Sequence, residues 1–142
     1  MSSPVIAPKF GIKDASFKAA GGVDGVRKLV DDFYSIMDEA EHASIIRRMH
    51  PADLTSSRDK LARFLCGWLG GPRLYTEKYG PISIPNVHAH LRIGEAERDA
   101  WLACMERAVA RQSFSPEFAA YLMAQLRIPA QRIVVTCAES GS

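Results

Sequence analysis

The chain has 142 residues, of which 47% are hydrophobic and 24% are charged, and its formal net charge is +2. A chain of this length and composition can bury one core, so we expect a single domain and exclude wholesale disorder. The basic residues are spread along the chain rather than clustered, which argues against nucleic acid as a partner.

The N-terminal part of the chain contains one strong helix signal. Residues 1–13 include two prolines and no apolar period, which predicts an irregular arm, and one helical turn is expected over 14–20. The pair Gly21–Gly22 then breaks the chain. From Val23 to Ala40 apolar residues recur every three or four positions, which predicts the first long helix.

The central part of the chain is expected to turn a corner between two helices. A short helical stretch over 45–49 has to stop before Pro51, because proline lacks the backbone N–H that a continuing helix needs. His50 is therefore placed at the corner. The next helix is expected to begin near Ser56, whose spacing to Asp59 matches a capping box.

A glycine-rich break and a long irregular segment follow that helix. The sequence Gly70–Gly71–Pro72 predicts its end. Most of 73–93 has no sustained period, so we expect a loop with a short helix over 75–79 and a turn around His88. A loop of this length inside a small domain usually has a function.

The last part of the chain predicts two helices and a tail. The run 95–110 is strongly helical, with acidic residues in its first turn. The pair Ser115–Pro116 is a typical cap and first helical position, and it opens the final helix. Pro129 is expected to close that helix. The tail over 129–142 contains a β-prone stretch without a partner strand, so we expect extension or disorder there.

These elements predict an all-α protein in three parts, which are an arm over 1–13, a helical domain over 14–128 and a tail over 129–142. The three cysteines are widely spaced and lack a C-x-x-C pair, which argues against a disulfide framework or a zinc knuckle and favours the cytoplasm. No segment has the pattern of a signal peptide or a membrane span, so we expect no membrane partner.

The loop histidines are the first candidates for chemistry. Helices that surround a weakly structured segment with a His-x-His pair suggest a ligand buried between helices. A neutral imidazole is a good axial ligand for haem iron. No C-x-x-C-H occurs, so such a haem would be held without covalent bonds. From the residues alone, His88 is either an exposed loop histidine or an iron ligand.

Several segments, at the spacing they have here, are typical of one known family. They are Gly21–Gly22, Phe33–Tyr34, Arg48–Met49–His50–Pro51, Gly70–Gly71–Pro72–Arg73–Leu74–Tyr75, Val87–His88–Ala89–His90–Leu91–Arg92–Ile93 and Glu97–Arg98–Asp99–Ala100–Trp101–Leu102. Over about residues 15–127 the sequence resembles the truncated haemoglobins of the second group. The segments Gly70–Tyr75 and Glu97–Leu102, at their mutual spacing, are specific evidence for this family. Any one of the segments alone would be weak evidence.

This resemblance implies a globin-like, truncated two-over-two helical sandwich around a non-covalent haem b, with 14–128 as the globin domain. His88 would be the proximal iron ligand. The distal side, where a diatomic gas binds, would be lined by Tyr34, His50, Leu61 and Trp101. Further haem contacts would come from Phe33 and Phe64, with Lys60, Arg63, Tyr75 and Arg92 as candidate partners of the propionates.

The sequence departs from the family pattern at two places. The family usually has proline two residues after the proximal histidine and then an aromatic residue, where this chain has His90 and Leu91. His90 is therefore a competing candidate for the iron, although a surface or propionate-facing role is favoured for it. The corner position of His50 is usually aromatic, and a histidine there could donate to a ligand, pack, or approach the iron.

The resemblance implies a haem protein that reversibly binds O2, CO or NO, with the ligand stabilised by hydrogen bonds from distal Tyr, Trp and His side chains. The same pocket could instead support a redox enzyme with peroxidase-like or nitric-oxide-detoxifying activity. A reductase would supply its electrons. A third reading is a haem-free helical interaction module. The sequence leaves open whether the chain is a monomer or a homodimer.

Overall fold

The computed structural model describes residues 10–81 and 93–140, the last five by their backbone alone. None of the residues in these ranges lies in a strand, and the prediction of an all-α protein is confirmed. The helices are α1 (Ala15–Ala19), α2 (Gly22–Glu39), the 3-10 helix η1 (Glu41–Ala43), α3 (Ser44–Arg47), α4 (Thr55–Trp68), α5 (Leu74–Tyr79), α7 (Glu95–Ala110) and α8 (Pro116–Ser140).

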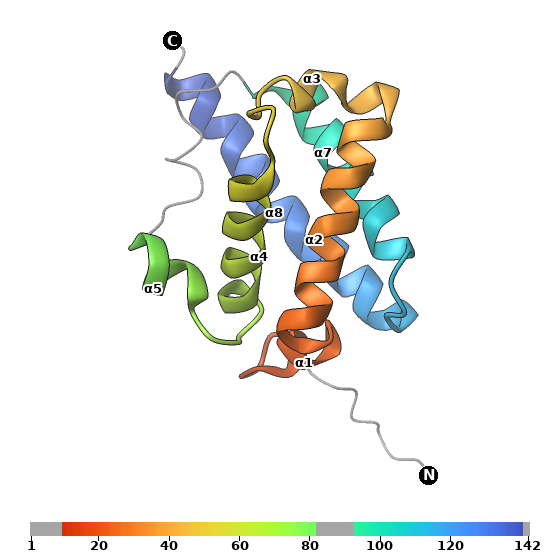
Figure 1. Ribbon diagram of the computed structural model, residues 1–142, viewed down its shortest axis with the longest axis vertical. Coiled ribbons are helices and arrows are strands. Elements are labelled where there is room, and N and C mark those ends of the chain that lie inside the picture. The colour runs from red at the N-terminus through yellow and green to blue at the C-terminus, as the bar shows by residue number, and fades with distance from the viewer. Residues whose placement is uncertain (1–9, 82–92, 141–142) are drawn as a thin grey trace.

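The four long helices form two antiparallel pairs (Figure 1). The first pair is α2 with α4 and the second is α7 with α8, and α2 also packs on α7. Helix α5 packs on the side of α4 that faces away from α2 (Figure 1). The core lies between the pairs, and its largest fully buried side chains are Leu29, Phe33, Ile36, Met37, Leu65, Met105, Phe118 and Leu122.

Helix α2 follows the predicted amphipathic pattern. All six apolar residues that predicted it are buried, and they are Val26, Leu29, Val30, Phe33, Tyr34 and Met37. Burial of such a stripe, rather than helix propensity, supplies most of the stability of a helix in a protein. The face that α2 turns to the core therefore fixes the positions of Phe33 and Tyr34.

The end of α4 is held by a close backbone approach at Gly70. This residue has φ +95°, and a Cβ atom there would lie 1.9 Å from the carbonyl oxygen of Lys13. Only glycine combines that conformation with that contact at little cost. The backbone N–H of Phe17 donates to the carbonyl of Leu69 at 3.0 Å, which ties the first turn of the chain to the end of α4.

The predicted caps are partly right. At the start of α8, the backbone N–H of Phe118 donates to Ser115 Oγ at 3.1 Å, as predicted. At the start of α4 the predicted capping box with Ser56 is wrong. Asp53 accepts the N–H of Thr55 at 2.9 Å instead. The carboxylate of Asp59 is engaged elsewhere, which leaves it unable to serve that box.

The prediction that Pro129 closes the last helix is wrong, because α8 continues through it to Ser140. An interior proline removes one helix hydrogen bond and costs about 3 kcal/mol. Packing beyond it opposes that cost, since Ala130 is only 8% exposed and Arg98 of α7 donates a hydrogen bond to the Gln131 side chain. The β-prone stretch over 133–135 is therefore helical.

Two further features bear on the sequence predictions. Cys66 and Cys104 are free and buried, and burial raises the pKa of both thiols. Over residues 10–81 and 93–140, no helix is both long enough and apolar enough to cross a bilayer.

Candidate functional site

The predicted distal residues meet where α2, the α3–α4 corner and α7 come together. The ring of Tyr34 lies 5.0 Å from that of Phe33 and 5.7 Å from that of His50, measured between centroids. The rings of Phe33 and Trp101 are 5.2 Å apart. We call Phe33, Tyr34, His50 and Trp101 the distal aromatic group. The structure thus brings together three of the four predicted distal residues, with Phe33 between Tyr34 and Trp101.

The hydroxyl of Tyr34 is the most informative polar atom of this group. The residue is only 5% exposed, and burial raises its pKa to about 12 although the charge of Arg58 acts in the opposite direction. The hydroxyl makes no hydrogen bond to another residue within the described ranges. No fully enclosed side-chain N or O atom there lacks a partner, so the Tyr34 oxygen reaches open space at the edge of the group.

Trp101 presents a second donor of the same kind. It lies on α7, is half-buried, and packs its ring against Phe33. Its indole N–H is a donor only, and it makes no hydrogen bond to another described residue. Phe33 itself is 0% exposed, so it supports the two polar aromatic residues from within the core.

His50 lies at the predicted corner between α3 and α4, and a backbone carbonyl of α3 orients its ring. Its Nδ1 atom lies 2.9 Å from the carbonyl oxygen of Ile46. Because a carbonyl only accepts, Nδ1 carries the proton. The Nε2 atom of a neutral ring is then an acceptor, and it becomes a donor only in the imidazolium form. Donation by His50 to a ligand therefore requires a charged ring.

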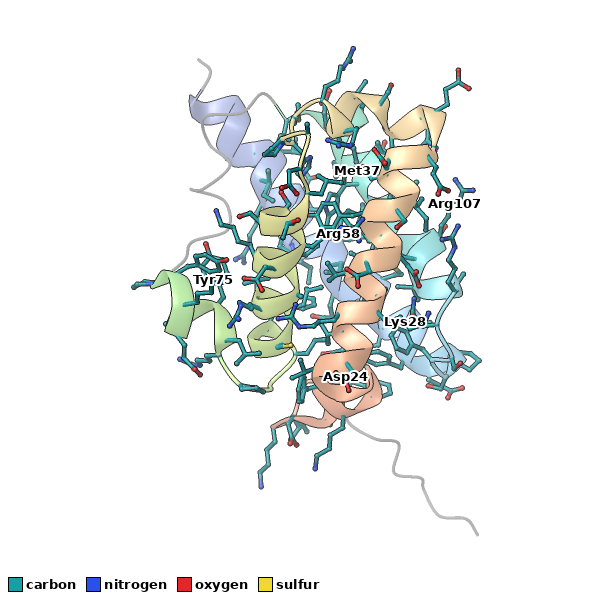
Figure 2. The ribbon with its side chains drawn as sticks, viewed as in Figure 1. Asp24, Lys28, Met37, Arg58, Tyr75 and Arg107 are labelled. Carbon is teal, nitrogen blue, oxygen red and sulfur yellow. The ribbon has the colours of Figure 1, made fainter. Side chains whose placement is uncertain are left out.

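Three of the predicted propionate partners gather around Tyr79. The Lys60 ammonium lies 5.4 Å from the Tyr79 ring centroid, and the rings of Tyr75 and Tyr79 are 5.0 Å apart. Figure 2 labels Tyr75 on α5, beside α4. Arg63 reaches the same place through Asp59, to which its Nε donates at 3.0 Å.

Asp59 is the centre of a set of charged and polar side chains that we call the Asp59 cluster. Its carboxylate accepts hydrogen bonds from Tyr79 at 2.7 Å, Lys78 at 2.9 Å, Arg63 at 3.0 Å and Arg27 at 3.4 Å. These donors come from α2, α4 and α5. The bonds from Tyr79 and Lys78 hold the pKa of Asp59 well below its usual range.

One face of α4 offers a strip of large apolar side chains. Leu61, Phe64 and Trp68 follow one another at helical spacing and are half-buried against the core. The rings of Phe64 and Trp68 are stacked with centroids 6.5 Å apart. The predicted distal residue Leu61 and haem contact Phe64 thus share one face, with the predicted rim cations Lys60 and Arg63 on the same helix.

These residues fit haem. An incompletely covered apolar strip suits a flat macrocycle, cations beside it suit two propionates, and open O–H and N–H donors suit a small polar ligand. The predicted iron ligand His88, its competitor His90 and the rim candidate Arg92 lie outside the described residues.

A hollow of about 250 Å³ lies elsewhere in the molecule. It is lined by residues between Gly11 and Ser16, by the end of α4 and by α8. Its lining includes Lys13, Tyr121 and Gln125, and it includes no member of the distal aromatic group. Among its described lining residues, Trp68 is the one that also belongs to the apolar strip of α4.

Sequence reasoning missed three residues of this region. Arg58 stacks over Tyr34, Asp59 joins three helices, and Tyr79 lies among the predicted rim residues. Two signals were available. Arg58 precedes Leu61 by one helical turn, and Tyr79 follows Tyr75 by one turn, so each shares a face with a predicted site residue. Three of the four partners of Asp59, namely Arg27, Lys78 and Tyr79, are distant in sequence and gave no local signal.

Comparison with known proteins identifies relatives along most of the chain. A family model described as bacterial-like globin matches residues 15–133. The chain is 34% identical over 113 residues to the protein named Group 2 truncated hemoglobin YjbI of Bacillus subtilis, covering 80% of this chain and 83% of that one.

Solved structures agree with that match. A group II 2-on-2 haemoglobin from Agrobacterium tumefaciens superposes with a TM-score of 0.79 at 34% identity, covering 94% of this chain and 97% of that one. A truncated oxygen-avid haemoglobin from Bacillus subtilis superposes with a TM-score of 0.77 at 31% identity, covering 84% and 98%. The predicted two-over-two globin architecture is thereby confirmed.

Proposed function

This chain belongs to the bacterial-like globin family as a group II truncated haemoglobin, and from that premise we propose that it reversibly binds O2 and other diatomic gases at a haem iron. We propose non-covalent haem b as the cofactor and His88 as the proximal ligand. Tyr34 and Trp101 are the proposed hydrogen-bond donors to the gas. A cytoplasmic location and a separate reductase complete the proposal.

The observation that carries this proposal is the pair of unused donors in the distal aromatic group. Each of these two donors belongs to a side chain that is packed against the core, so its position is fixed by its neighbours. The Tyr34 hydroxyl and the Trp101 indole N–H make no hydrogen bond to another described residue, although their rings are packed against the core. Two donors held in place at the edge of a core favour a small ligand that accepts hydrogen bonds.

The remaining residues have supporting roles in this proposal. When bound, haem supplies an iron atom to which O2, CO or NO can bind. Leu61, Phe64 and Trp68 exclude water from the macrocycle. Lys60 and Arg63 offer charge to the propionates, and Arg63 would share its guanidinium between Asp59 and that group. An imidazole such as His88 needs its second N–H held by an acceptor to serve as a good ligand.

A relative supports O2 as the ligand. The similar Bacillus subtilis structure is described as an oxygen-avid haemoglobin. Hydrogen bonds from fixed donors slow the release of a ligand that carries partial negative charge. Tyr34 and Trp101 would act in this way here.

Reversible oxygenation tests the proposal. Reduced, haem-loaded protein is cycled between O2 and argon while its visible spectrum is followed. We expect an oxygenated spectrum that returns to the ferrous spectrum over repeated cycles. Immediate conversion to the ferric form at each addition of O2 would contradict a reversible binder. Purified protein that takes up no haem would favour the haem-free interaction module.

The same preparation separates the binder from a redox enzyme. Peroxide and a reducing dye are added to wild type and to Tyr34→Phe. We expect no sustained turnover above that of free haem for either protein. Sustained turnover in wild type that collapses in Tyr34→Phe would overturn gas binding as the main activity and favour the peroxidase-like alternative.

A further inference from the structure

The geometry points to Arg58 as a positioning residue for the distal tyrosine: its guanidinium fixes the Tyr34 ring and strengthens the hydroxyl as a hydrogen-bond donor to the gas. This inference rests on the proposed function. It assigns control of ligand affinity to a residue outside the set that the family resemblance supplied.

The first step is the placement of Arg58 over the ring. The guanidinium carbon lies 5.8 Å from the Tyr34 ring centroid, within the range of a cation–π contact. Arg58 lies on α4 and Tyr34 on α2, so the contact spans the first helix pair. Figure 2 shows Arg58 in the space between these two helices.

The second step is the anchor that holds the guanidinium there. Its Nη1 atom donates to both the backbone carbonyl and the carboxylate Oδ1 of Asp31, each at 3.1 Å. Asp31 precedes Tyr34 by three residues, which is about one turn of the same helix. Because the cation is fixed to the helix that carries the ring, the contact does not depend on a freely moving side chain.

The third step is the effect on the hydroxyl. A phenol that donates a hydrogen bond gains partial negative charge, which a cation over the ring stabilises. The Arg58 side chain is 32% exposed, so solvent screens part of this effect. The same charge opposes the burial that raises the pKa of Tyr34. Stronger donation from Tyr34 would slow ligand release.

Other charged and titratable groups around the ring do not supply this effect. Asp31 is on the same helix and is paired with Arg58, so its negative charge is partly neutralised. The corner contributes His50, whose ring meets Tyr34 edge-on. From α7 the distal aromatic group includes Trp101, which does not titrate. Among residues 10–81 and 93–140, Arg58 is thus the cation that lies over the ring.

The C–O stretching frequency of the ferrous carbon-monoxide form tests this inference, because a hydrogen bond to the ligand lowers that frequency. We expect Arg58→Met to raise the frequency part of the way toward the value of Tyr34→Phe. O2 release should become roughly two- to fivefold faster, the factor that corresponds to a partly exposed cation–π contact. Arg58→Lys retains the charge and should stay closer to wild type.

Two controls separate the contact from general damage. Lys28→Met removes an exposed ion pair with Asp32 on α2 and should leave the frequency unchanged. In the Tyr34→Phe background, Arg58→Met should add no further shift, because the hydroxyl it acts on is absent.

The outcomes distinguish this inference from the proposed function. A shift in Tyr34→Phe combined with none in Arg58→Met would overturn the role of Arg58 alone. An equal shift from Arg58→Met in the presence and absence of the Tyr34 hydroxyl would overturn it as well, as would an Arg58→Lys shift as large as that of Arg58→Met. A wild-type frequency in Tyr34→Phe would overturn distal donation by Tyr34 in the proposed function, and this inference with it.

Discussion

The distal aromatic group and the Asp59 cluster both include residues of α2, but the polar side chains of the two differ in their hydrogen bonding. In the distal aromatic group, the Tyr34 hydroxyl lies at the edge of the core and makes no hydrogen bond to another described residue. In the Asp59 cluster, one carboxylate accepts bonds from four side chains. Under the proposed function the first arrangement keeps donors for a ligand, whereas the second uses its donors to hold α2, α4 and α5 together.

The largest expected effect on this contrast is on ligand release. Tyr34→Phe should speed O2 dissociation by roughly 10- to 100-fold, because a hydrogen bond to a charged acceptor is worth about 1.5–3 kcal/mol. Stopped-flow mixing of the oxygenated protein with carbon monoxide measures the rate. Asp59→Asn should change it by less than about twofold, since Asp59 acts on the helices. Equal dissociation rates for wild type and Tyr34→Phe would contradict the proposal that the Tyr34 hydroxyl donates to the ligand.

The stability of the two variants should show the reverse order. Asp59→Asn should lower the free energy of unfolding by about 1–3 kcal/mol, because its carboxylate is only 20% exposed and its charge-assisted bonds are lost. Tyr34→Phe should change it by less than about 0.5 kcal/mol, since no protein partner is abandoned. Urea unfolding of the haem-free proteins measures both. A larger loss in Tyr34→Phe than in Asp59→Asn would show that the roles are assigned the wrong way round.

Acid should weaken the Asp59 cluster selectively. Hydrogen bonds from Tyr79 and Lys78 lower the pKa of folded Asp59 below its ordinary value of 3.8. The folded state therefore binds this proton less tightly than the unfolded state, and the stabilisation is present above the unfolded pKa and lost as pH falls through the folded one. Between about pH 5 and pH 2, wild type should lose more stability than Asp59→Asn. Parallel losses would mean that other carboxylates control acid unfolding.

Alkali should ionise Tyr34 in the distal aromatic group. Its effect on stability should be smaller than that of acid on the Asp59 cluster. Burial raises the pKa of Tyr34 from 10.0 to about 12. The folded state holds this proton more tightly, so the contribution to stability is full below the unfolded pKa and declines as pH rises toward the folded one. The ultraviolet difference titration of wild type minus Tyr34→Phe should show one phenol ionising near pH 12. Ionisation near the ordinary value would show that the hydroxyl is solvated.

Local sequence patterns predicted most helices, because each long helix buries an apolar face at helical spacing. The exceptions depend on contacts that local patterns do not contain. Pro129 was expected to end α8, but packing of Ala130 and the contact with Arg98 continue the helix. Asp59 was assigned to a cap by its spacing, whereas its partners Arg27 and Tyr79 come from other helices.

The candidate site was predictable to a similar extent. The family resemblance named Tyr34, His50 and Trp101, and the structure places them in one group. It did not name Arg58, because the spacing of Arg58 to Leu61 indicates a shared helix face but not the contact with Tyr34 on another helix. Nor could it assign the protonation of His50, which follows from the distance between Nδ1 and the Ile46 carbonyl.

The central claim, that this chain holds haem through His88, is tested most directly by titrating the haem-free protein with haemin. Wild type and His90→Ala should each take up one equivalent, with a sharp Soret band and a ferrous carbon-monoxide spectrum typical of an imidazole-ligated haem. His88→Ala should lose that spectrum and bind haemin weakly. An unchanged spectrum and stoichiometry in His88→Ala would contradict the account.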